Sequence, residues 1–180
     1  MERRGKFSKT IILLFILFLL WALMLIIAPM FLPQDSVKDL TGTTVIIDNE
    51  GEISEMPFPC NVIYSIGDSL CHQKADRSFF INGNQMPFCS RCMGIWIGLA
   101  IGLGFMVFYK LQLDRKFLFL IIIGLIPIGI DGLGQLFGFW ESTNVIRVIT
   151  GLLTGIVCGA AIGLIIDEIR EIRQAKNIKK

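Results

Sequence analysis

The chain has 180 residues, of which 53% are apolar and 18% are charged, and its mean hydropathy is +0.66. Its formal net charge of +2 supplies no strong field, so no nucleic-acid partner is expected. The apolar share exceeds the roughly 45–50% usual for soluble domains. The apolar residues also form blocks long enough to cross a bilayer, which excludes a soluble globular protein and predicts a polytopic, all-α membrane protein surrounded by lipid.

Four apolar segments predict the transmembrane helices of an integral membrane four-helix bundle: about 11–32, 88–109, 117–139 and 144–166. The first segment follows the basic stretch MERRGKFSK, which is also typical of a secretory signal peptide. It is longer than the apolar core of a signal peptide, about 7–15 residues, and no small-x-small cleavage pattern follows it. We therefore expect an uncleaved membrane anchor.

The distribution of basic residues predicts the orientation of the chain in a plasma membrane. The long segment 33–87 is acidic and carries only Lys38, Lys74 and Arg77. Because cytoplasmic segments are enriched in Lys and Arg, both termini are expected to be cytoplasmic and the long loop to lie outside. Most of the 17 Lys and Arg residues lie on the predicted inner side: Arg3, Arg4, Lys6, Lys9, Lys110, Arg115, Lys116, Arg170, Arg173, Lys176, Lys179 and Lys180.

We expect four parts along the chain. Residues 1–32 form the tail and first anchor, 33–69 an outer loop, 70–167 a core with three transmembrane helices and a Cys/His site, and 168–180 a charged inner tail. In the outer loop, residues 43–56 (TTVIIDNEGEISEM) predict a small β-hairpin around an Asn-Glu-Gly turn. Residues 59–73 predict a short amphipathic helix on the outer membrane face, which would bring Cys71 and His72 to the mouth of the bundle.

Glycines recur every four residues in the second and fourth predicted helices. Small residues on one helix face allow two backbones to approach closely where water provides no hydrophobic drive. The pattern favours packing within the bundle, and a homo-oligomer through the same stripes is the alternative. The two stripes are Gly94, Gly98 and Gly102, and Gly151, Gly155, Gly159 and Gly163.

Four chemically capable side chains, Cys71, His72, Cys89 and Cys92, lie within two dozen residues. A CxxC turn holds two sulfurs at one ion, and a Cys and an imidazole nearby would complete a site that suits zinc, with iron as an alternative. Neighbouring side chains diverge, so Cys71 and His72 would not both bind one ion easily; if one binds, a coordination position stays open. The spacing favours this metal interpretation.

Two other interpretations of the cysteines remain open. In the redox interpretation, Cys89-Ser-Arg-Cys92 is a reactive dithiol at a helix start, with Cys71 or Cys60 as the resolving partner. In the structural interpretation, the outer cysteines form disulfides, which an outer compartment permits. Five cysteines cannot all pair, and Cys158 in the fourth predicted helix is the natural remainder.

Polar residues in the third and fourth predicted helices converge on the same end of the bundle. Asp131 would lie about 12 Å from the outer end of its helix at 1.5 Å per residue, with Gln135 one turn above it. The link FWEST is short, so the two helices are expected to be antiparallel neighbours and Arg147 to reach toward Asp131. Ionisable residues within a membrane suggest a functional site. The alternative is an Asp131–Arg147 pair that only sets helix register.

Three stretches of the chain, CHQ, RSFFINGNQMPFCSRCMGIWIG and DGLGQLFGFWESTNVIRVITG, resemble the signature of a known family. It is a group of small polytopic membrane proteins of bacteria and archaea, classed as a domain of unknown function. The resemblance covers about residues 70–165 and implies a common site without implying an activity. The positions it marks are Cys71, His72, Gln73, Arg77, Ser78, Gln85, Pro87, Cys89, Arg91, Cys92, Gly94, Asp131, Ser142, Asn144, Arg147 and Gly151.

Several marked residues have roles that their chemistry suggests. Gln73, Gln85 and Asn144 are neutral hydrogen-bonding groups suited to orienting metal ligands. Arg77 and Arg91 could bind an anionic head group or phosphate, although single arginines are more often interfacial anchors.

The expected function is a metal site at the outer membrane face with metal-dependent chemistry on a lipid-like or membrane-proximal substrate. In that chemistry Asp131 would act as general base or orient a water, and Arg147 would stabilise negative charge. The alternatives are a thiol–disulfide redox protein using Cys89 and Cys92, and a non-enzymatic transporter subunit or metal sensor. Whether the protein is an enzyme stays open at this point.

Overall fold

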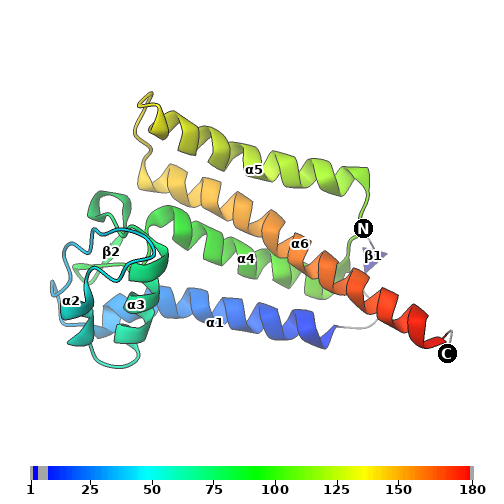
Figure 1. Ribbon diagram of the computed structural model, residues 1–180, viewed down its shortest axis with the longest axis horizontal. Helices are drawn as coiled ribbons and strands as arrows, with labels where there is room; N and C mark the ends of the chain where they lie inside the picture. Colours follow the sequence, from blue (N-terminus) through cyan, green and yellow to red (C-terminus); the bar gives the residue numbers. More distant parts are fainter. Residues whose placement is uncertain (1, 4–7, 179–180) are drawn as a thin grey trace.

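Four long helices dominate the computed structural model, which describes residues 2–3 and 8–178 (Figure 1). They are α1 (Lys9–Phe31), α4 (Ser90–Phe108), α5 (Arg115–Leu136) and α6 (Asn144–Ile178). Each is long and apolar enough to cross a membrane. The predicted all-α four-helix membrane bundle is therefore confirmed.

Helix α6 continues without interruption into the charged C-terminal segment. Its 35 residues correspond to about 52 Å at 1.5 Å per residue, which exceeds a hydrocarbon core of about 30 Å. The last turns of α6 therefore extend beyond the length that a bilayer core can cover. At the same end, β1 (Glu2–Arg3) pairs antiparallel with β4 (Tyr109–Lys110).

The two glycine stripes pack against each other inside the chain. A Cβ on Gly98 would lie 2.4 Å from the carbonyl oxygen of Leu152 and 2.8 Å from Cα of Gly155, so only glycine permits this approach of α4 to α6. In the same way, a Cβ on Gly151 would lie 2.2 Å from the carbonyl oxygen of Arg91. The favoured interpretation of the stripes, packing within the bundle, fits this geometry, and their glycine faces are occupied by each other.

Helix α5 packs on α6 and presents apolar side chains outward along its length. Phe117 and Gly124 are buried on its inner side, and the helix begins where the Asp114 side chain accepts a hydrogen bond from the amide of Phe117 at 2.8 Å. An apolar outer face of this kind is what lipid requires of a transmembrane helix. The outward residues include Leu118, Phe119, Ile122, Ile123, Ile126, Ile130 and Leu133.

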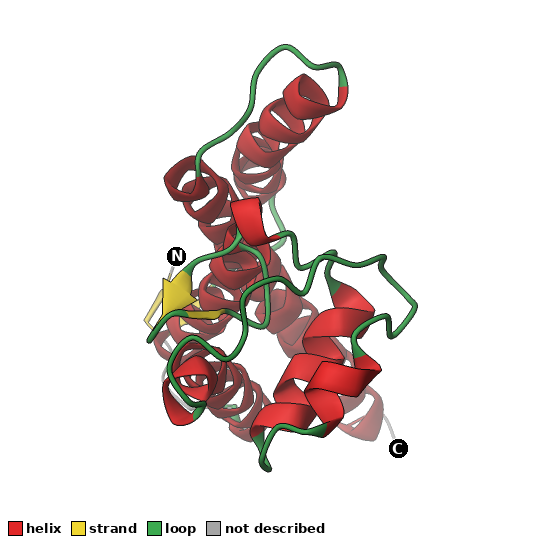
Figure 2. Cartoon of the chain, turned by 90° about the vertical axis from the view of Figure 1, so that its left-hand side faces the viewer, coloured by secondary structure: helices red, strands yellow, loops and turns green. Residues whose placement is uncertain are grey.

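Residues 33–87, which we call the cap, fold over one end of the bundle (Figures 1 and 2). The cap contains α2 (Glu50–Ser54), α3 (Cys60–Leu70), the 3-10 turn η1 (Ala75–Arg77) and the strands β2 (Phe80–Ile81) and β3 (Asn84–Gln85). Helix α3 lies across the end of the bundle, as Figure 1 shows, and matches the short helix predicted there. Viewed onto the cap in Figure 2, α5 stands at the top, away from α2 and α3.

The β-hairpin of the cap is not where the sequence predicted it. Residues 43–56 were expected to pair as strands, but they form a turn followed by α2. Val45, Ile46 and Ile47 are exposed, whereas Ile53 and Met56, three residues apart, are buried. The apolar run is thus a surface turn, and the buried residues follow a helical spacing. The hairpin that exists joins β2 to β3.

A buried polar network holds the cap together. The Asn84 side chain is fully buried: its oxygen accepts from the amides of Ser36 at 2.8 Å and Val37 at 3.0 Å, and its nitrogen donates to the carbonyls of Pro29 at 3.0 Å and Pro33 at 2.9 Å. It therefore ties the end of α1 to the start of the cap. The amide of Val37 and the carbonyl of Pro29, both in buried residues, depend on this side chain, whereas the amide of Ser36 also donates to the carbonyl of Pro33 at 3.3 Å.

Gln85 and Tyr64 extend this network. The Gln85 side chain accepts from the amide of Leu40 at 3.0 Å and donates to the carbonyl of Gln73. The hydroxyl of Tyr64 donates to the carbonyl of Gln85 at 2.6 Å, and burial raises the pKa of this phenol, so it remains a donor at neutral pH. The cap is therefore a folded unit with its own polar core.

The start of α1 and the end of α6 lie at the opposite end of the bundle from the cap (Figure 1). This arrangement accommodates the predicted orientation, with the cap outside and both termini inside. Which side of a membrane each end faces stays a prediction. Four of the basic residues counted for it, Arg4, Lys6, Lys179 and Lys180, lie outside the described residues.

Candidate metal centre

Three local features bring Cys71 to the start of α4. Helix α3 ends at Leu70, and Cys71 continues in an extended conformation. Asn82 and Gly83 both have positive φ, 56° and 73°, which defines a tight hairpin turn of the kind Asn-Gly favours and reverses the chain. The Gln73 side chain then donates to the carbonyl of Pro87 at 2.8 Å, which fixes the segment leading into Cys89.

Gly67 of α3 allows this segment to approach the helix. A Cβ at this position would lie 2.0 Å from the carbonyl oxygen of Pro87 and 2.8 Å from Nε2 of Gln73. Any larger residue would push the chain before Cys89 away from α3. The glycine therefore contributes to the site although it carries no functional group.

Cys71, Cys89 and Cys92 form a compact cluster in which all three Sγ atoms lie within 4.8 Å of one another. Cys71 is buried, and the other two, around the first turn of α4, are half-buried. Three sulfurs around tetrahedral zinc, each about 2.3 Å from the ion, lie about 3.8 Å apart. A contraction of under about 1 Å would therefore bring the three sulfurs to one ion.

The surroundings of the cluster favour a thiolate at Cys89. The amide of Cys89 donates to Sγ of Cys71 at 3.4 Å, and the N-terminus of α4 directs its partial positive charge at Cys89. Hydrogen bonds from the side chains of Cys71 and then Cys92 hold the pKa of Cys89 well below its usual range. The same hydrogen bond to Cys89 raises the pKa of Cys71, because the Cys71 thiol must keep its proton to donate it to the Cys89 sulfur. A cluster that already shares protons in this way is suited to exchange them for a metal ion.

His72 lies outside the sulfur cluster. It is exposed, and its ring nitrogens do not belong to the group of donor atoms within 4.8 Å of one another. The reason is local: Cys71 is in extended backbone, so adjacent side chains point to opposite sides. Of the four predicted ligands, the donor group found among the described residues contains the three sulfurs and not His72. A tetrahedral ion held by these three sulfurs alone would have one further position.

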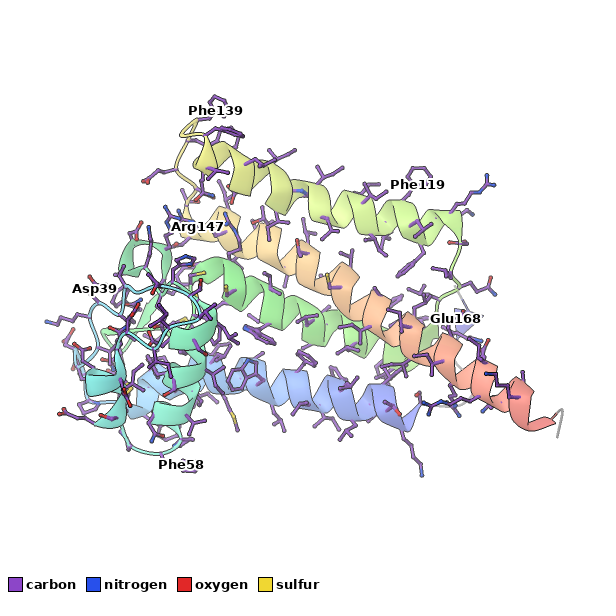
Figure 3. The ribbon with its side chains drawn as sticks, in the orientation of Figure 1. Asp39, Phe58, Phe119, Phe139, Arg147 and Glu168 are labelled. Carbon is purple, nitrogen blue, oxygen red and sulfur yellow. The ribbon has the colours of Figure 1, made fainter. Side chains whose placement is uncertain are left out.

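A cavity of about 430 Å³ opens beside the sulfurs. The three cysteines and His72 line it together with four cationic residues, Lys74, Arg77, Arg91 and Arg147, and with Thr44 and Leu70. Figure 3 shows Arg147 at the first turns of α6, next to the cap. Lys74 and Thr44 were missed by the sequence analysis, since neither belongs to a motif with a recognised chemistry.

Asp131 pairs with Arg91, not with Arg147 as the sequence predicted. The carboxylate accepts from the guanidinium of Arg91 and from Nε2 of Gln135 at 2.9 Å. Arg147 reaches this group only through Gln135, whose oxygen accepts from Nη2 of Arg147 at 3.2 Å. The first turn of α4 packs beside α6, so Arg91 can extend to α5, an arrangement that the short link between α5 and α6 does not reveal.

The remaining predicted site residues bind backbone or each other. Asn144 donates to the carbonyl of Ser78 at 3.2 Å and accepts from Nη1 of Arg147 at 3.2 Å, so it joins the cap to α6. Gln73 and Gln85 hold the backbone of the cap, as described above. Their hydrogen bonds position the cysteines through the main chain, and none of these hydrogen bonds involves a sulfur.

All five cysteines are free thiols in the described structure. Sγ of Cys60 contacts the carbonyl oxygen of Ala28 at 3.5 Å within the core between α1 and the cap. Cys158 lies along α6, away from the cluster. Neither belongs to the candidate metal centre, so both serve as comparison positions.

The chain belongs to the family of predicted membrane proteins DUF2085, whose model matches residues 71–161. It is 42% identical over 95 residues to an uncharacterized protein of Methanocaldococcus jannaschii, a match that covers 52% of this chain and 61% of the relative. It is 38% identical over 87 residues to an uncharacterized protein of Methanothermobacter thermautotrophicus, covering 48% of this chain and 78% of the relative. No solved structure matches. The family membership agrees with the resemblance in the sequence and confirms a multi-pass membrane protein.

Proposed function

We propose that this protein is a membrane-embedded metalloprotein in which Cys71, Cys89 and Cys92 bind one zinc ion. The observation that carries the proposal is the cluster itself: three Sγ atoms from two separate segments lie within 4.8 Å of one another. A structural zinc site is usually closed by four protein ligands, whereas a catalytic site has three and keeps one position open. The three-sulfur set with an adjacent cavity supports the catalytic type.

The proposed chemistry is metal-dependent and acts on a lipid-like or membrane-proximal substrate. A zinc ion with an open position can polarise a substrate oxygen or lower the pKa of a bound water. Arg147 and Arg91 line the cavity and would stabilise negative charge there. Asp131 accepts from Arg91 and Gln135 and is absent from the cavity lining. We therefore assign it to positioning these cations, in preference to the role of general base.

The proposed location is the outer face of the plasma membrane, with both termini in the cytoplasm. The acidic cap and the basic segments at the opposite end of the bundle support this orientation. Outside the cytoplasm a dithiol can be oxidised, so a thiol–disulfide function of Cys89 and Cys92 is the second candidate. The lowered pKa of Cys89 is the observation in its favour.

Metal content, with a thiol count on the same detergent-purified protein, separates the two candidates. We expect about one zinc per chain in the wild type and in Cys158→Ser, and almost none in Cys89→Ser or Cys92→Ser. Metal-free protein in which Cys89 and Cys92 are oxidised, and are reduced by a mild dithiol, would contradict the metal proposal and support the redox function.

A further inference from the structure

Arg147 carries a buried charge without an acidic partner. The residue is 4% exposed. Its guanidinium donates to two neutral oxygens, those of Asn144 and Gln135, each at 3.2 Å, and its Nε has no hydrogen-bond partner in the described structure. Among the described residues, no carboxylate forms a salt bridge with it. A buried cation is normally paired with an anion, so this arrangement favours the binding of an anionic ligand at Arg147.

The cavity that Arg147 lines is strongly basic. Lys74, Arg77 and Arg91 line it as well, and none of its lining residues is acidic. Arg91 is paired with Asp131 behind the cavity, and Nε of Arg77 lies 3.5 Å from the exposed Asp76. Even with three thiolates and a zinc ion, which together carry one negative charge, the lining retains an excess of positive charge. The cavity is thus prepared for an anionic ligand.

We propose that this cavity binds a phosphate group, held by Arg147 and Arg77 beside the three cysteines. The guanidinium fork matches two phosphate oxygens at once, whereas an ammonium acts as a point charge. A volume of about 430 Å³ is within the range of small-molecule sites and accommodates a phosphorylated head group or a small phosphate ester. The inference deepens the proposed function by naming the ligand class, and rests on it for the chemistry but not for binding.

Calorimetric titration of detergent-purified protein with inorganic phosphate, glycerol 3-phosphate and dihexanoyl phosphatidic acid tests the proposal. We expect saturable binding by the wild type and a roughly tenfold to hundredfold loss of affinity in Arg147→Gln. Arg147→Lys keeps the positive charge but loses the guanidinium fork, so its phosphate affinity is expected to lie between those of the wild type and Arg147→Gln. Arg173→Gln, which removes an exposed positive charge at the other end of α6, should bind as the wild type does.

The three ligands distinguish the source of the phosphate. Much tighter binding of the phosphatidic acid identifies a lipid head group, and equal binding of all three identifies a soluble phosphate compound. Repeating the titration on Cys89→Ser, which is expected to lose the zinc ion, separates the two proposals. Phosphate binding by this variant would support the phosphate site independently of the metal centre. No binding of any of the three by the wild type would overturn the proposal, as would unchanged affinity in Arg147→Gln.

A second variant covers the case in which Arg147→Gln does not fold, as judged by helical circular dichroism. Arg77 lies in η1 of the cap, outside the transmembrane helices, and is only partly buried. Arg77→Gln should therefore fold and still lose at least about fivefold in affinity for phosphate. Wild-type affinity in a folded Arg77→Gln would contradict its part in the site.

Discussion

The two ends of the same helix pair, α4 and α6, differ in how their charged side chains are paired. At the cap end, Arg147 of α6 is buried and Arg91 of α4 is partly buried, and both line the cavity that contains the cysteines. Arg91 pairs there with the buried Asp131 of α5. At the other end, Lys110 pairs with Glu171, and both side chains are partly exposed, at 39% and 51%, although Asp167 of α6 is buried there too. Burying a charge is costly, and a buried cation without an acidic partner is the most costly arrangement. The feature that distinguishes the cap end, and that supports the function proposed for it, is the buried Arg147, which has no acidic partner among the described residues.

The largest effect on stability is expected from removing the polar anchor of the cap. Asn84→Ala leaves the buried amide of Val37 and the buried carbonyl of Pro29 without this partner, at about 1–3 kcal/mol for each unsatisfied group. The free energy of unfolding should fall by about 4 kcal/mol, as measured by denaturant titration in detergent micelles. The matched variant Asn61→Ala, whose side chain contacts only the neighbouring amide, should change it by less than about 0.5 kcal/mol.

The ion pairs at the two ends provide the next contrast. Asp131→Asn removes the countercharge of Arg91 and should lower the free energy of unfolding by about 3 kcal/mol. Glu171→Gln breaks the exposed pair with Lys110 and should lower it by less than about 1 kcal/mol. Equal losses for the two variants, measured in the same micelles, would remove the distinction between the ends.

The glycine contact between α4 and α6 should be sensitive to the addition of a single methyl group. Gly98→Ala places a Cβ 2.4 Å from a backbone oxygen of α6, and neither backbone can move far, so a loss of about 2 kcal/mol is expected. Gly132→Ala on α5 meets nothing within 4 Å and should be neutral or slightly stabilising. Thermal unfolding of both variants side by side checks this, and a harmless Gly98→Ala would argue against the close helix contact.

The smallest effect is expected at His72, within the cap end itself. His72→Ala should change zinc affinity by less than about threefold, because the imidazole lies outside the sulfur cluster. Competition with a chromophoric chelator measures this affinity, and a loss above about a hundredfold would restore His72 as a ligand.

For the wild type, zinc affinity measured by the same competition should fall as the pH is lowered, since protons compete for the three thiolates.

The helices, the short helix of the cap and the meeting of Cys71 with the CxxC motif could be predicted from sequence, because each depends on local patterns. Apolar length defines a span, and Asn82-Gly83 defines the turn that returns the chain to α4. Two errors came from tertiary context. Val45, Ile46 and Ile47 suggested a strand but form an exposed turn, and Arg91 replaces Arg147 as partner of Asp131.

The polar network of the cap could not be predicted at all. Asn84 is not among the positions that the family resemblance marks, yet its side chain is fully buried and binds four backbone groups between Pro29 and Val37. Nothing in a polar residue beside a turn indicates whether it faces water or the interior. The lack of an acidic partner for Arg147 could not be predicted from the sequence either, because it depends on which carboxylates lie near it in the folded structure.

The most direct test of the metal centre is X-ray absorption spectroscopy at the zinc edge on the purified protein. The account predicts three sulfur neighbours at about 2.3 Å and one oxygen or nitrogen neighbour at about 2.0 Å, with the sulfur shell unchanged in His72→Ala. Addition of phosphate should leave the three sulfurs in place. A shell made only of oxygen and nitrogen, or one that keeps three sulfurs in Cys71→Ser, would contradict it.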